Sequence, residues 1–441
     1  MPPQTITALS LATTRYTASN PLSQAQHALA TSSLPGGNTR TLLHTSPFPL
    51  TMSHGAGPYL YDLDSHNYLD LTGDMSAGLY GHTPPPPLRA AINSVFDTAG
   101  VSLGATTALE QRYAALLCER FGMERVRMCN SGTEANLYAL TAVRKFTGKK
   151  KIVVFAGGYH GGVLSFPGTE VGEGVVDGGD FVVVPRYNDV EAARRVIEEV
   201  AGRCELAGVL VEAVQGAGGV IPGEKEFLKE VREAARRAGG LFVLDEVMTS
   251  RLAPGGLGRE MGLEPDLVTL GKYLGGGFAF GAFGGREEVM RVYDPRVKGG
   301  LGHSGTFNNN TMAMSVGFAG LKEVFTAERC GEFNKMGDRF RERLAKVAEG
   351  TSFSFTGRGS LIGVHCTDDG RKEIKTVGDL AGERTDLKDL FWFEMLEKDF
   401  WIARRGFMAL ILDTPEEELD RFVDAVVGFL ERHRELVKIT T

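Results

Sequence analysis

Three segments of the sequence carry side chains that could act together on one organic cofactor. The small-residue turn Ser131-Gly132-Thr133 opens a helical pattern, Asp245 ends an apolar run, and Lys272 follows another apolar run 27 residues later. Free N–H groups at a helix start bind a dianion, and a carboxylate keeps a pyridine nitrogen protonated. A desolvated lysine amine has a lowered pKa and bonds covalently to an aldehyde. Together these groups predict pyridoxal 5'-phosphate (PLP) as the cofactor, with Lys272 and Asp245 as catalytic residues.

Each of these residues also has an ordinary structural interpretation. Ser131 and Glu134 have the spacing of a capping box, so the turn alone fits a helix cap as well as it fits a phosphate site. Asp245 alone fits a helix cap too, and Lys272 alone fits a solvated surface lysine. Their positions relative to the predicted strands decide between the two interpretations.

Short apolar strands alternate with amphipathic helices in the middle of the chain, which predicts an α/β fold with a mostly parallel sheet covered on both faces. The expected helices include 189–200, capped by Asn188 or Asp189, and 227–238. The expected strands 151–155, 207–211, 241–244 and 267–270 are followed by Tyr159 and His160, by Glu212, by Asp245 and by Lys272, respectively. Ligands bind beyond the carboxyl ends of such strands, so these side chains should converge on one site.

The pattern of predicted elements and composition divides the chain into three parts. Residues 1–87 form an N-terminal arm and a segment of a small domain, 88–325 form a large cofactor-binding domain, and 326–441 form a C-terminal small domain of α+β type. Thr414-Pro415-Glu416-Glu417 reads as a helix start with Thr414 as the cap. The helix that follows presents one apolar face: Leu419, Phe422, Val423, Val426, Phe429 and Leu430.

Composition excludes several classes of protein. The 441 residues carry a net charge of −7 and show no basic stripe, so neither nucleic acid nor an anionic membrane surface is an expected partner. No apolar run approaches the roughly 20 residues of a membrane span. The five cysteines are odd in number and form no CxxC pair, so we expect free thiols in the cytoplasm and no metal site. A mitochondrial signal in the Ser/Thr-rich first twenty residues stays open.

Neighbours of the predicted site residues have assigned roles as well. Val247 lies one side-chain alternation beyond Asp245 and should face the cofactor ring, whereas Glu246 points the other way and is structural. Tyr159 either stacks on that ring or is a core aromatic. His160 has no second histidine at helical spacing, so it is not a metal ligand. The loop Gly357-Arg358-Gly359-Ser360 precedes a strand-like run rather than a helix, which excludes a dinucleotide site there.

The chain resembles the class III (fold type I) aminotransferases, and within them the branch of β-phenylalanine transaminases and glutamate-1-semialdehyde aminomutases. Five segments carry the resemblance: Ser131–Asn136, Gly157–Gly161, Asp245–Arg251, Leu270–Tyr273 and His303–Asn310. The resemblance covers nearly everything from about Ala18 onward. It implies a mostly parallel, seven-stranded large-domain sheet and a small domain built from both ends of the chain.

The resemblance also implies a homodimer with shared active sites, in which Thr306 of the partner subunit completes the phosphate site and Gln215 lies near the phenolic oxygen. Arg40 matches the residue that holds the carboxylate of a β-amino acid, and Arg405 matches the one that holds the α-carboxylate of the 2-oxo acid. For each arginine a surface salt bridge is the alternative. The predicted cofactor-binding residues are Ser131, Gly132, Thr133, Tyr159, His160, Glu212, Gln215, Asp245, Val247, Lys272 and Thr306.

We therefore expect a PLP-dependent aminotransferase that moves an amino group from a β-amino acid or related amine to a 2-oxo acid by a ping-pong mechanism. Thr249–Pro254 and Arg405-Gly406-Phe407 are similar to the β-phenylalanine transaminases. Ala213, in place of a proline, and Met75, in place of a tyrosine, depart from their pattern, and Met75 leaves the side-chain preference open. The alternatives are a glutamate-1-semialdehyde aminomutase and, more distantly, a non-catalytic protein of this fold.

Overall fold

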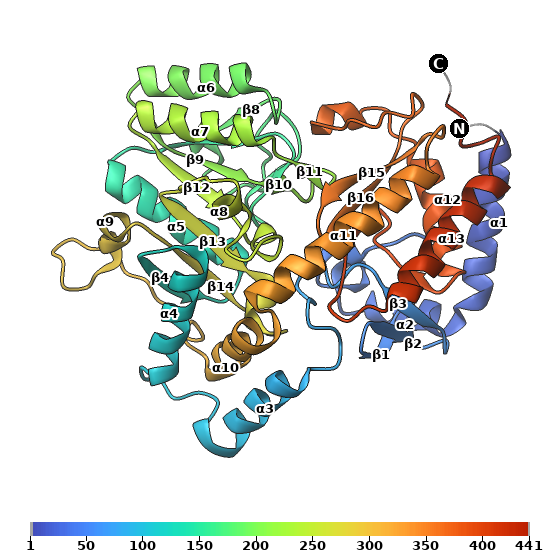
Figure 1. Ribbon diagram of the computed structural model, residues 1–441, viewed down its shortest axis with the longest axis horizontal. Helices are drawn as coiled ribbons and strands as arrows, with labels where there is room; N and C mark the ends of the chain where they lie inside the picture. Colours follow the sequence, from blue (N-terminus) through green and yellow to red (C-terminus); the bar gives the residue numbers. More distant parts are fainter. Residues whose placement is uncertain (1–2, 440–441) are drawn as a thin grey trace.

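The computed structural model describes residues 3–439, and the lobe on the left of Figure 1 is built around a seven-stranded sheet. Its strand order is β4-β14-β13-β12-β9-β5-β8. The bounds are Arg125–Cys129, Gly281–Gly285, Leu267–Gly271, Leu241–Asp245, Leu206–Glu212, Lys151–Phe155 and Phe181–Val184, in that order. Only β14 is antiparallel to its neighbours, β13 and β4, and the other adjacent pairs are parallel. The predicted mostly parallel sheet is confirmed.

Helices cover both faces of this sheet because its strands are apolar on both sides. Val153 of β5 and Phe242 of β12 belong to a core with α6 (Val190–Gly202) and α7 (Lys225–Arg237). The alternate residues Ile152 and Val243 belong to a second core with α5 (Gly132–Thr147). Successive side chains of a strand point to opposite faces, so the two cores are separated by the sheet.

The predicted element bounds hold to within about two residues. Strand β5 matches its prediction, β9 and β12 extend to include Glu212 and Asp245, and α7 begins two residues before the predicted start. Of the two predicted caps for α6, the structure selects Asp189, whose side chain accepts the N–H of Ala192 at 2.9 Å. The acidic residues at the strand ends are thus the last residues of their strands.

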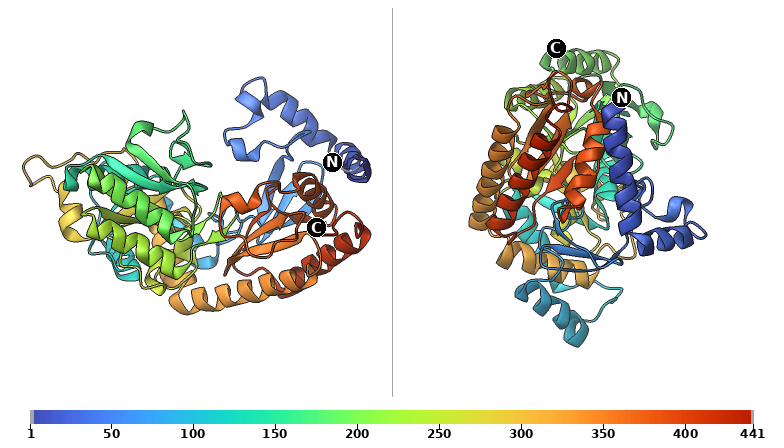
Figure 2. Two further views of the ribbon diagram at one scale, coloured as in Figure 1. Left: turned by 90° about the horizontal axis from the view of Figure 1, so that it is seen from above. Right: turned by 90° about the vertical axis from the view of Figure 1, so that its right-hand side faces the viewer.

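The two ends of the chain meet in a second lobe (Figures 1 and 2). Strand β17 (Phe400–Trp401), from the C-terminal part, pairs in parallel with β3 (Asn67–Asp70) of the N-terminal sheet. That sheet also contains β1 (Met52–Ala56) and β2 (Tyr59–Asp62). A three-stranded sheet is formed by β15, β16 and β18, at Phe353–Arg358, Leu361–Cys366 and Phe407–Ala409. The small α+β lobe built from both ends is confirmed, whereas boundaries at residues 87 and 325 stay a prediction.

The remaining elements surround these sheets. The helices of the second lobe are α1 (Pro3–Ser19), α2 (Pro21–Ala30), α11 (Ala327–Val347), α12 (Thr385–Leu396) and α13 (Glu416–Arg432). The other helices are α3 (Pro86–Ser94), α4 (Ala108–Phe121), α8 (Leu257–Glu260), α9 (Glu287–Met290) and α10 (Thr311–Ala319). The short strands are β6 (Gly158–Tyr159), β7 (Ser165–Phe166), β10 (Val214–Gln215) and β11 (Ile221–Pro222). Within residues 3–439, none of the helices combines the length and hydropathy that a membrane span requires.

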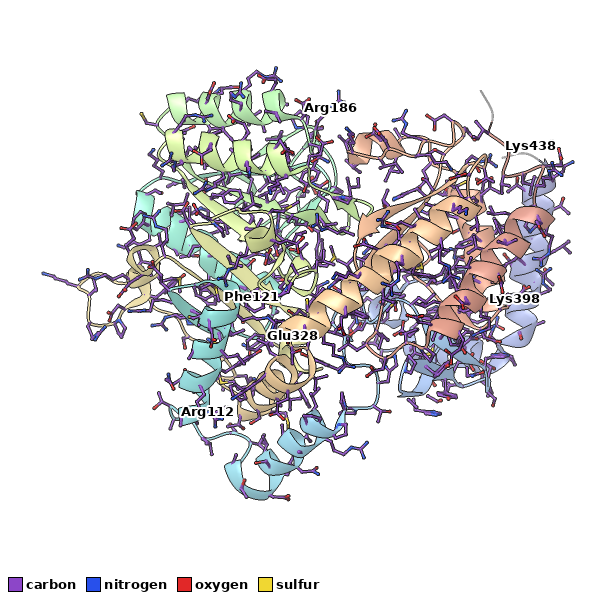
Figure 3. The ribbon with its side chains drawn as sticks, in the orientation of Figure 1. Arg112, Phe121, Arg186, Glu328, Lys398 and Lys438 are labelled. Atoms are coloured by element: carbon purple, nitrogen blue, oxygen red, sulfur yellow. The ribbon has the colours of Figure 1, made fainter. Side chains whose placement is uncertain are left out.

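Helix α11 connects the two lobes. Near its start Arg120, at the end of α4, donates to the carbonyl oxygen of Phe325 at 3.1 Å. Phe121 and Glu328 are labelled in this region in Figure 3. Further along, the helix packs against β15 and α13, so one rigid element touches both parts of the fold.

The predicted cap of α13 is wrong by one residue. Pro415, with an extended backbone (ψ 138°), occupies the N-cap position, and the helix begins at Glu416. The hydroxyl of Thr414 is buried and donates instead to the carbonyl oxygen of Ile411 at 2.8 Å, so it is not free to cap the helix. The predicted apolar face of this helix is buried as expected.

Candidate active site

Three functional strand ends are neighbours in the large sheet. Asp245 pairs with Glu212 of β9 on one side and with Thr269 of β13 on the other. Strand β13 ends at Gly271, directly before Lys272. Strand β5, which precedes Tyr159 and His160, is the next neighbour of β9. The parallel register therefore places the predicted residues at one edge, as the sequence pattern indicated.

The carboxylate of Asp245 is buried and held on both oxygens. Its Oδ1 accepts the backbone N–H of Val247 at 3.0 Å, and its Oδ2 accepts Nδ2 of Asn136 at 2.8 Å. The Nδ1 of His160 lies 2.8 Å from the same Oδ2. Asn136 is fixed in turn, because its Oδ1 accepts the hydroxyl of Thr269 at 2.8 Å. These partners fix the orientation of the Asp245 carboxylate.

The amine of Lys272 has two hydrogen-bond acceptors on one loop. Its Nζ donates to the carbonyl oxygen of Met75 at 2.5 Å and to Oγ of Ser76 at 3.0 Å. Burial lowers the pKa of Lys272 to about 8, and the positive charges of Arg405 and Arg251 act in the same direction. The negative charges of Asp245 and Glu212 oppose the shift. At pH 7 about a tenth of this amine is therefore neutral, far more than for an ordinary lysine, and the neutral form is the one that reacts with a carbonyl.

The loop that holds this amine has an unusual backbone. Asp74, Met75 and Ser76 are all left-handed, with φ of 44°, 53° and 73°, and Lys272 is left-handed at 57°. Non-glycine residues in this region carry strain that surrounding contacts must stabilise, and such residues gather at functional sites. Arg40 supplies one contact, because its guanidinium donates to Asp74 Oδ1 at 2.7 Å. The predicted substrate arginine thus contacts the loop that touches the lysine.

The turn before α5 combines a cap with open N–H groups. Ser131 is the N-cap and its Oγ accepts the N–H of Glu134 at 3.2 Å, whereas Glu134 accepts the N–H of Asn130 instead of that of Ser131. The first N–H groups of a helix have no acceptor within the helix, so those of Gly132 and Thr133 remain suited to an anion. A Cβ on Gly132 would lie 2.8 Å from Val247, which shows that the turn contacts the segment after Asp245.

Glu212 and Gln215 line the next part of the edge. Glu212 accepts the N–H groups of Tyr159 (2.9 Å) and Gly216 (3.1 Å), and burial raises its pKa to about 7. The Nε2 of Gln215 donates to the carbonyl oxygen of Ala156 at 2.9 Å. Its Oε1 is buried and has no partner within residues 3–439. An orphaned acceptor of this kind fits a hydroxyl donor on a bound ligand.

The remaining predicted residues lie at the rim. Tyr159 is 47% exposed, which excludes the core-aromatic alternative, and its stacking on a ring stays a prediction. Arg405 keeps solvent access and lies over the ring of Phe407 at 5.4 Å. Neighbouring atoms desolvate its guanidinium enough to lower the pKa of Arg405, against the charges of Tyr159 and Glu212. Thr306 is exposed on the loop between Ser304 and Asn310.

Three residues of the site were not predicted from the sequence. Asn136 had a detectable signal, since it is a buried amide on the apolar face of α5, beside Ala135 and Ala139. Ser76 had none, because its loop shows no periodicity. Arg251 was part of a quoted motif, but nothing in its spacing indicated that its side chain would be fully buried.

The residues present fit PLP. A lysine amine with a lowered pKa, an oriented buried carboxylate, a helix start and an orphaned amide oxygen correspond to the aldehyde, ring nitrogen, phosphate and phenolic hydroxyl of that molecule. No second cofactor is required to account for these groups.

Comparisons with known proteins agree with this fit. The sequence pattern of the family described as "Aminotransferase class-III" matches residues 43–385. The β-phenylalanine transaminase of Variovorax paradoxus is 46% identical over 98% of this chain and 97% of its own length. The crystal structure of a β-phenylalanine aminotransferase from that organism covers 99% of this chain, and all of its own chain is matched, with a TM-score of 0.95 and 45% identity. A glutamate-1-semialdehyde 2,1-aminomutase of Acetivibrio thermocellus is 33% identical over 90% of this chain and 95% of its own length.

The lowered pKa of Lys272 predicts how cofactor capture depends on pH. Only the unprotonated amine attacks the aldehyde, so the rate of PLP capture by apoenzyme should rise with pH until it passes about 8. Between pH 7 and pH 9 we expect a rise of about tenfold, whereas an ordinary lysine would give about a hundredfold. Stopped-flow absorbance measures the rate.

Borohydride reduction followed by peptide mass analysis identifies the lysine that has reacted. Wild type should carry the label on Lys272, and Lys272→Ala should carry none. A label on another lysine, or a hundredfold rise, would contradict the assignment.

Proposed function

This chain belongs to the class III aminotransferase family, and we propose that it transfers an amino group from a β-amino acid or related amine to a 2-oxo acid such as 2-oxoglutarate or pyruvate. It is a PLP-dependent enzyme, which argues against a non-catalytic protein of this fold. Two guanidinium groups carry the substrate proposal. Arg40 pairs with Asp74 of the loop that holds the Lys272 amine, and Arg405 is close enough to lower the pKa of Lys272.

Lys272 acts as the base in the proposed reaction. When bound, PLP supplies an electron sink that stabilises negative charge on the amine-bearing carbon of the substrate. The Nζ of Lys272, with a pKa of about 8, can take a proton from that carbon and return one near neutral pH. Met75 and Ser76 accept its two N–H groups, so the lone pair of the neutral amine points away from their loop.

The other cofactor-site residues act by binding and charge. The buried carboxylate of Asp245 holds a proton on the ring nitrogen by charge pairing, while Asn136 and His160 prevent it from turning away. The N–H groups of Gly132 and Thr133 bind the phosphate. We assign Glu212, Gln215, Tyr159 and Val247 to the walls of the same site, as the sequence predicted.

The β-amino acid and the 2-oxo acid each carry a carboxylate, and each carboxylate needs its own cationic partner. Arg40 and Asp74 form an ion pair with side chains 47% and 54% exposed, and pairs this open contribute only about 0–1 kcal/mol. The carboxylate of an incoming β-amino acid can therefore replace Asp74 at little cost. Arg405 has no ion pair with a carboxylate within residues 3–439 and lies over the ring of Phe407, which suits it to the 2-oxo acid.

The aminomutase alternative has weaker support. The aminomutase relative shares 33% identity with this chain, against 46% for the transaminase. An intramolecular shift of an amine would need no second carboxylate substrate. The presence of both Arg40 and Arg405 favours a reaction between two molecules.

We also propose a homodimer with shared sites, in which Thr306 of the partner subunit contacts the phosphate. Five large apolar side chains are exposed around the loops next to α3 and α10: Phe96, Val101, Leu103, Phe278 and Phe307. The hydroxyl of Thr311 donates to the carbonyl oxygen of Gly100 at 2.6 Å, which joins two of these loops. Exposed apolar groups of this extent are typical of an interface.

The cytoplasm remains the proposed location. All five cysteines lie within the described residues and none forms a disulfide, which suits a reducing compartment.

A donor and acceptor panel tests the proposed reaction. With PLP bound, we expect turnover of β-amino acid donors such as β-phenylalanine with 2-oxoglutarate or pyruvate, and no turnover when the 2-oxo acid is omitted. Liquid chromatography of the new amino acid measures it. Isomerisation of glutamate-1-semialdehyde without an added acceptor, faster than any transamination, would support the aminomutase instead.

Each arginine should determine the KM of one of the two substrates. A charge-assisted hydrogen bond contributes about 1.5–3 kcal/mol, so Arg40→Ala should raise KM for the β-amino acid roughly ten- to a hundredfold. KM for an amine without a carboxylate should not change. Arg405→Ala should raise KM for the 2-oxo acid instead.

Asp74→Asn is the matched control, since it frees Arg40 without removing the guanidinium. Its KM for the β-amino acid should equal that of wild type or fall below it. Equal losses for all amines in Arg40→Ala would contradict a carboxylate-binding role.

Complementation tests the shared site. Light scattering should give twice the chain mass of 47.6 kDa. Lys272→Ala and Thr306→Glu subunits, inactive when separate, should regain activity when mixed, because one site of each heterodimer then has an intact lysine and an intact threonine. If Thr306 served its own subunit, mixing would restore nothing.

A further inference from the structure

Arg251 is the largest fully buried side chain of residues 3–439, and it has no acidic partner there. It belongs to a 3₁₀ turn at Thr249–Arg251, shortly after Asp245. A buried charge without a counter-ion is unfavourable unless its hydrogen bonds are satisfied. A guanidinium buried in this position therefore indicates a role beyond packing.

Three acceptors from two parts of the fold satisfy the guanidinium. Nε donates to Oγ of Ser360 at 3.1 Å, and the terminal nitrogens donate to the carbonyl oxygens of Ser76 (3.3 Å) and Leu410. Ser360 lies in the turn between β15 and β16, and Leu410 directly follows β18. Both belong to the small-lobe sheet at the centre right of Figure 1. Arg251 thus joins that sheet to the catalytic edge of the large one.

The backbone of Arg251 is held as firmly as its side chain. Its carbonyl oxygen accepts Nδ2 of Asn334 from α11 at 2.8 Å, and the Oδ1 of Asn334 accepts the N–H of Ser360 at 2.9 Å. The guanidinium also lies over the ring of Phe333 at 5.6 Å. The arginine has little freedom to move independently of the small lobe.

Ser76 connects this cluster to the reacting lysine. Its carbonyl oxygen accepts Arg251, and its hydroxyl accepts the amine of Lys272. Ser76 is fully buried and left-handed, so its conformation depends on such external contacts. Loss of the Arg251 contact would release the backbone that carries one of the two acceptors of the amine.

We propose that Arg251 is a positioning residue that orients the Lys272 amine through Ser76. Because Arg251 also binds Ser360 and Leu410, the orientation of the amine depends on the position of the small lobe. The inference rests on the PLP chemistry of the site and not on the identity of the amine donor. A failure of the substrate panel would leave it standing.

Charge gives a second, independent consequence of the same placement. Around Lys272 stand Asp245, Glu212, Arg405 and Arg251, and the arginines favour its neutral form. Desolvation lowers the pKa of Arg251 itself to about 10, partly offset by Tyr273, Cys330 and Tyr80, so it stays charged at neutral pH. Removing this charge should make the lysine nitrogen easier to protonate.

The experiment compares Arg251→Gln, Arg251→Lys and the matched control Ser360→Ala in the holoenzyme. Circular dichroism and cofactor content first establish folding and loading. The absorbance of the lysine–cofactor linkage is then titrated with pH, and kcat and KM are measured with the best donor and acceptor of the panel.

Arg251→Gln should lower kcat roughly ten- to a hundredfold with little change in KM. Its spectral midpoint should move upward by roughly half a unit to one unit, because a cation has been removed. Arg251→Lys should keep the wild-type midpoint but not the wild-type kcat. Its ammonium group keeps the charge but lacks the planar set of N–H donors of a guanidinium. Ser360→Ala removes one of the two hydrogen bonds to the small lobe but keeps the charge and the Ser76 contact, so it should lower kcat less than Arg251→Gln does and leave the spectral midpoint unchanged.

Unchanged kcat and midpoint in folded, loaded Arg251→Gln would overturn the proposal, and so would equal effects of Ser360→Ala. If Arg251→Gln fails to fold, Arg251→Lys and Ser76→Ala test the proposal in its place. Both should lower kcat; wild-type values in both would refute the positioning role.

Discussion

The hydrogen-bonded register of β9, β12 and β13 is the constraint on which the rest of the site depends. Because the three strands run in parallel and end at the same level, Glu212, Asp245 and Lys272 reach one edge without any long loop. Every other partner is then arranged around fixed points: Asn136 and His160 on the carboxylate, Met75 and Ser76 on the amine. A slip of one residue in β12 would turn Asp245 to the opposite face of the sheet.

Burial brings the pKa values of the ionisable groups at this edge toward neutrality, raising those of the acids and lowering that of the lysine. It raises the pKa of Glu212 and of Glu246 to about 7 and lowers that of Lys272 to about 8. Glu246 is structural, as predicted, because its carboxylate accepts the N–H of Gly258 at 2.5 Å. Poor solvation disfavours the charged forms of both the acids and the lysine. The protonated and unprotonated forms of these side chains therefore differ little in free energy near neutral pH.

Much of this arrangement could be predicted from the sequence, and the unpredicted remainder has a physical explanation. Apolar runs and helical periodicity are local signals, so the order of strands and the residues at their ends could be predicted. The contacts of Arg251 go to two backbone carbonyl oxygens and one serine, and any residue supplies a carbonyl. The left-handed loop at Ser76 likewise depends on distant contacts and shows no repeating pattern. Thr414 matched a capping motif, but its hydroxyl had a competing acceptor that only the folded chain supplies.

The left-handed backbone at Met75 limits how this enzyme can be redesigned or can diverge. The resemblance associates position 75 with the side-chain pocket, so it is an obvious place to seek a new substrate range. Its φ of 53° is accessible to glycine and asparagine but strained for valine, isoleucine and threonine. A library at this position would therefore be filtered first by the conformation of the main chain and only then by the shape of the substrate. Branched side chains would have to enter the pocket from another position.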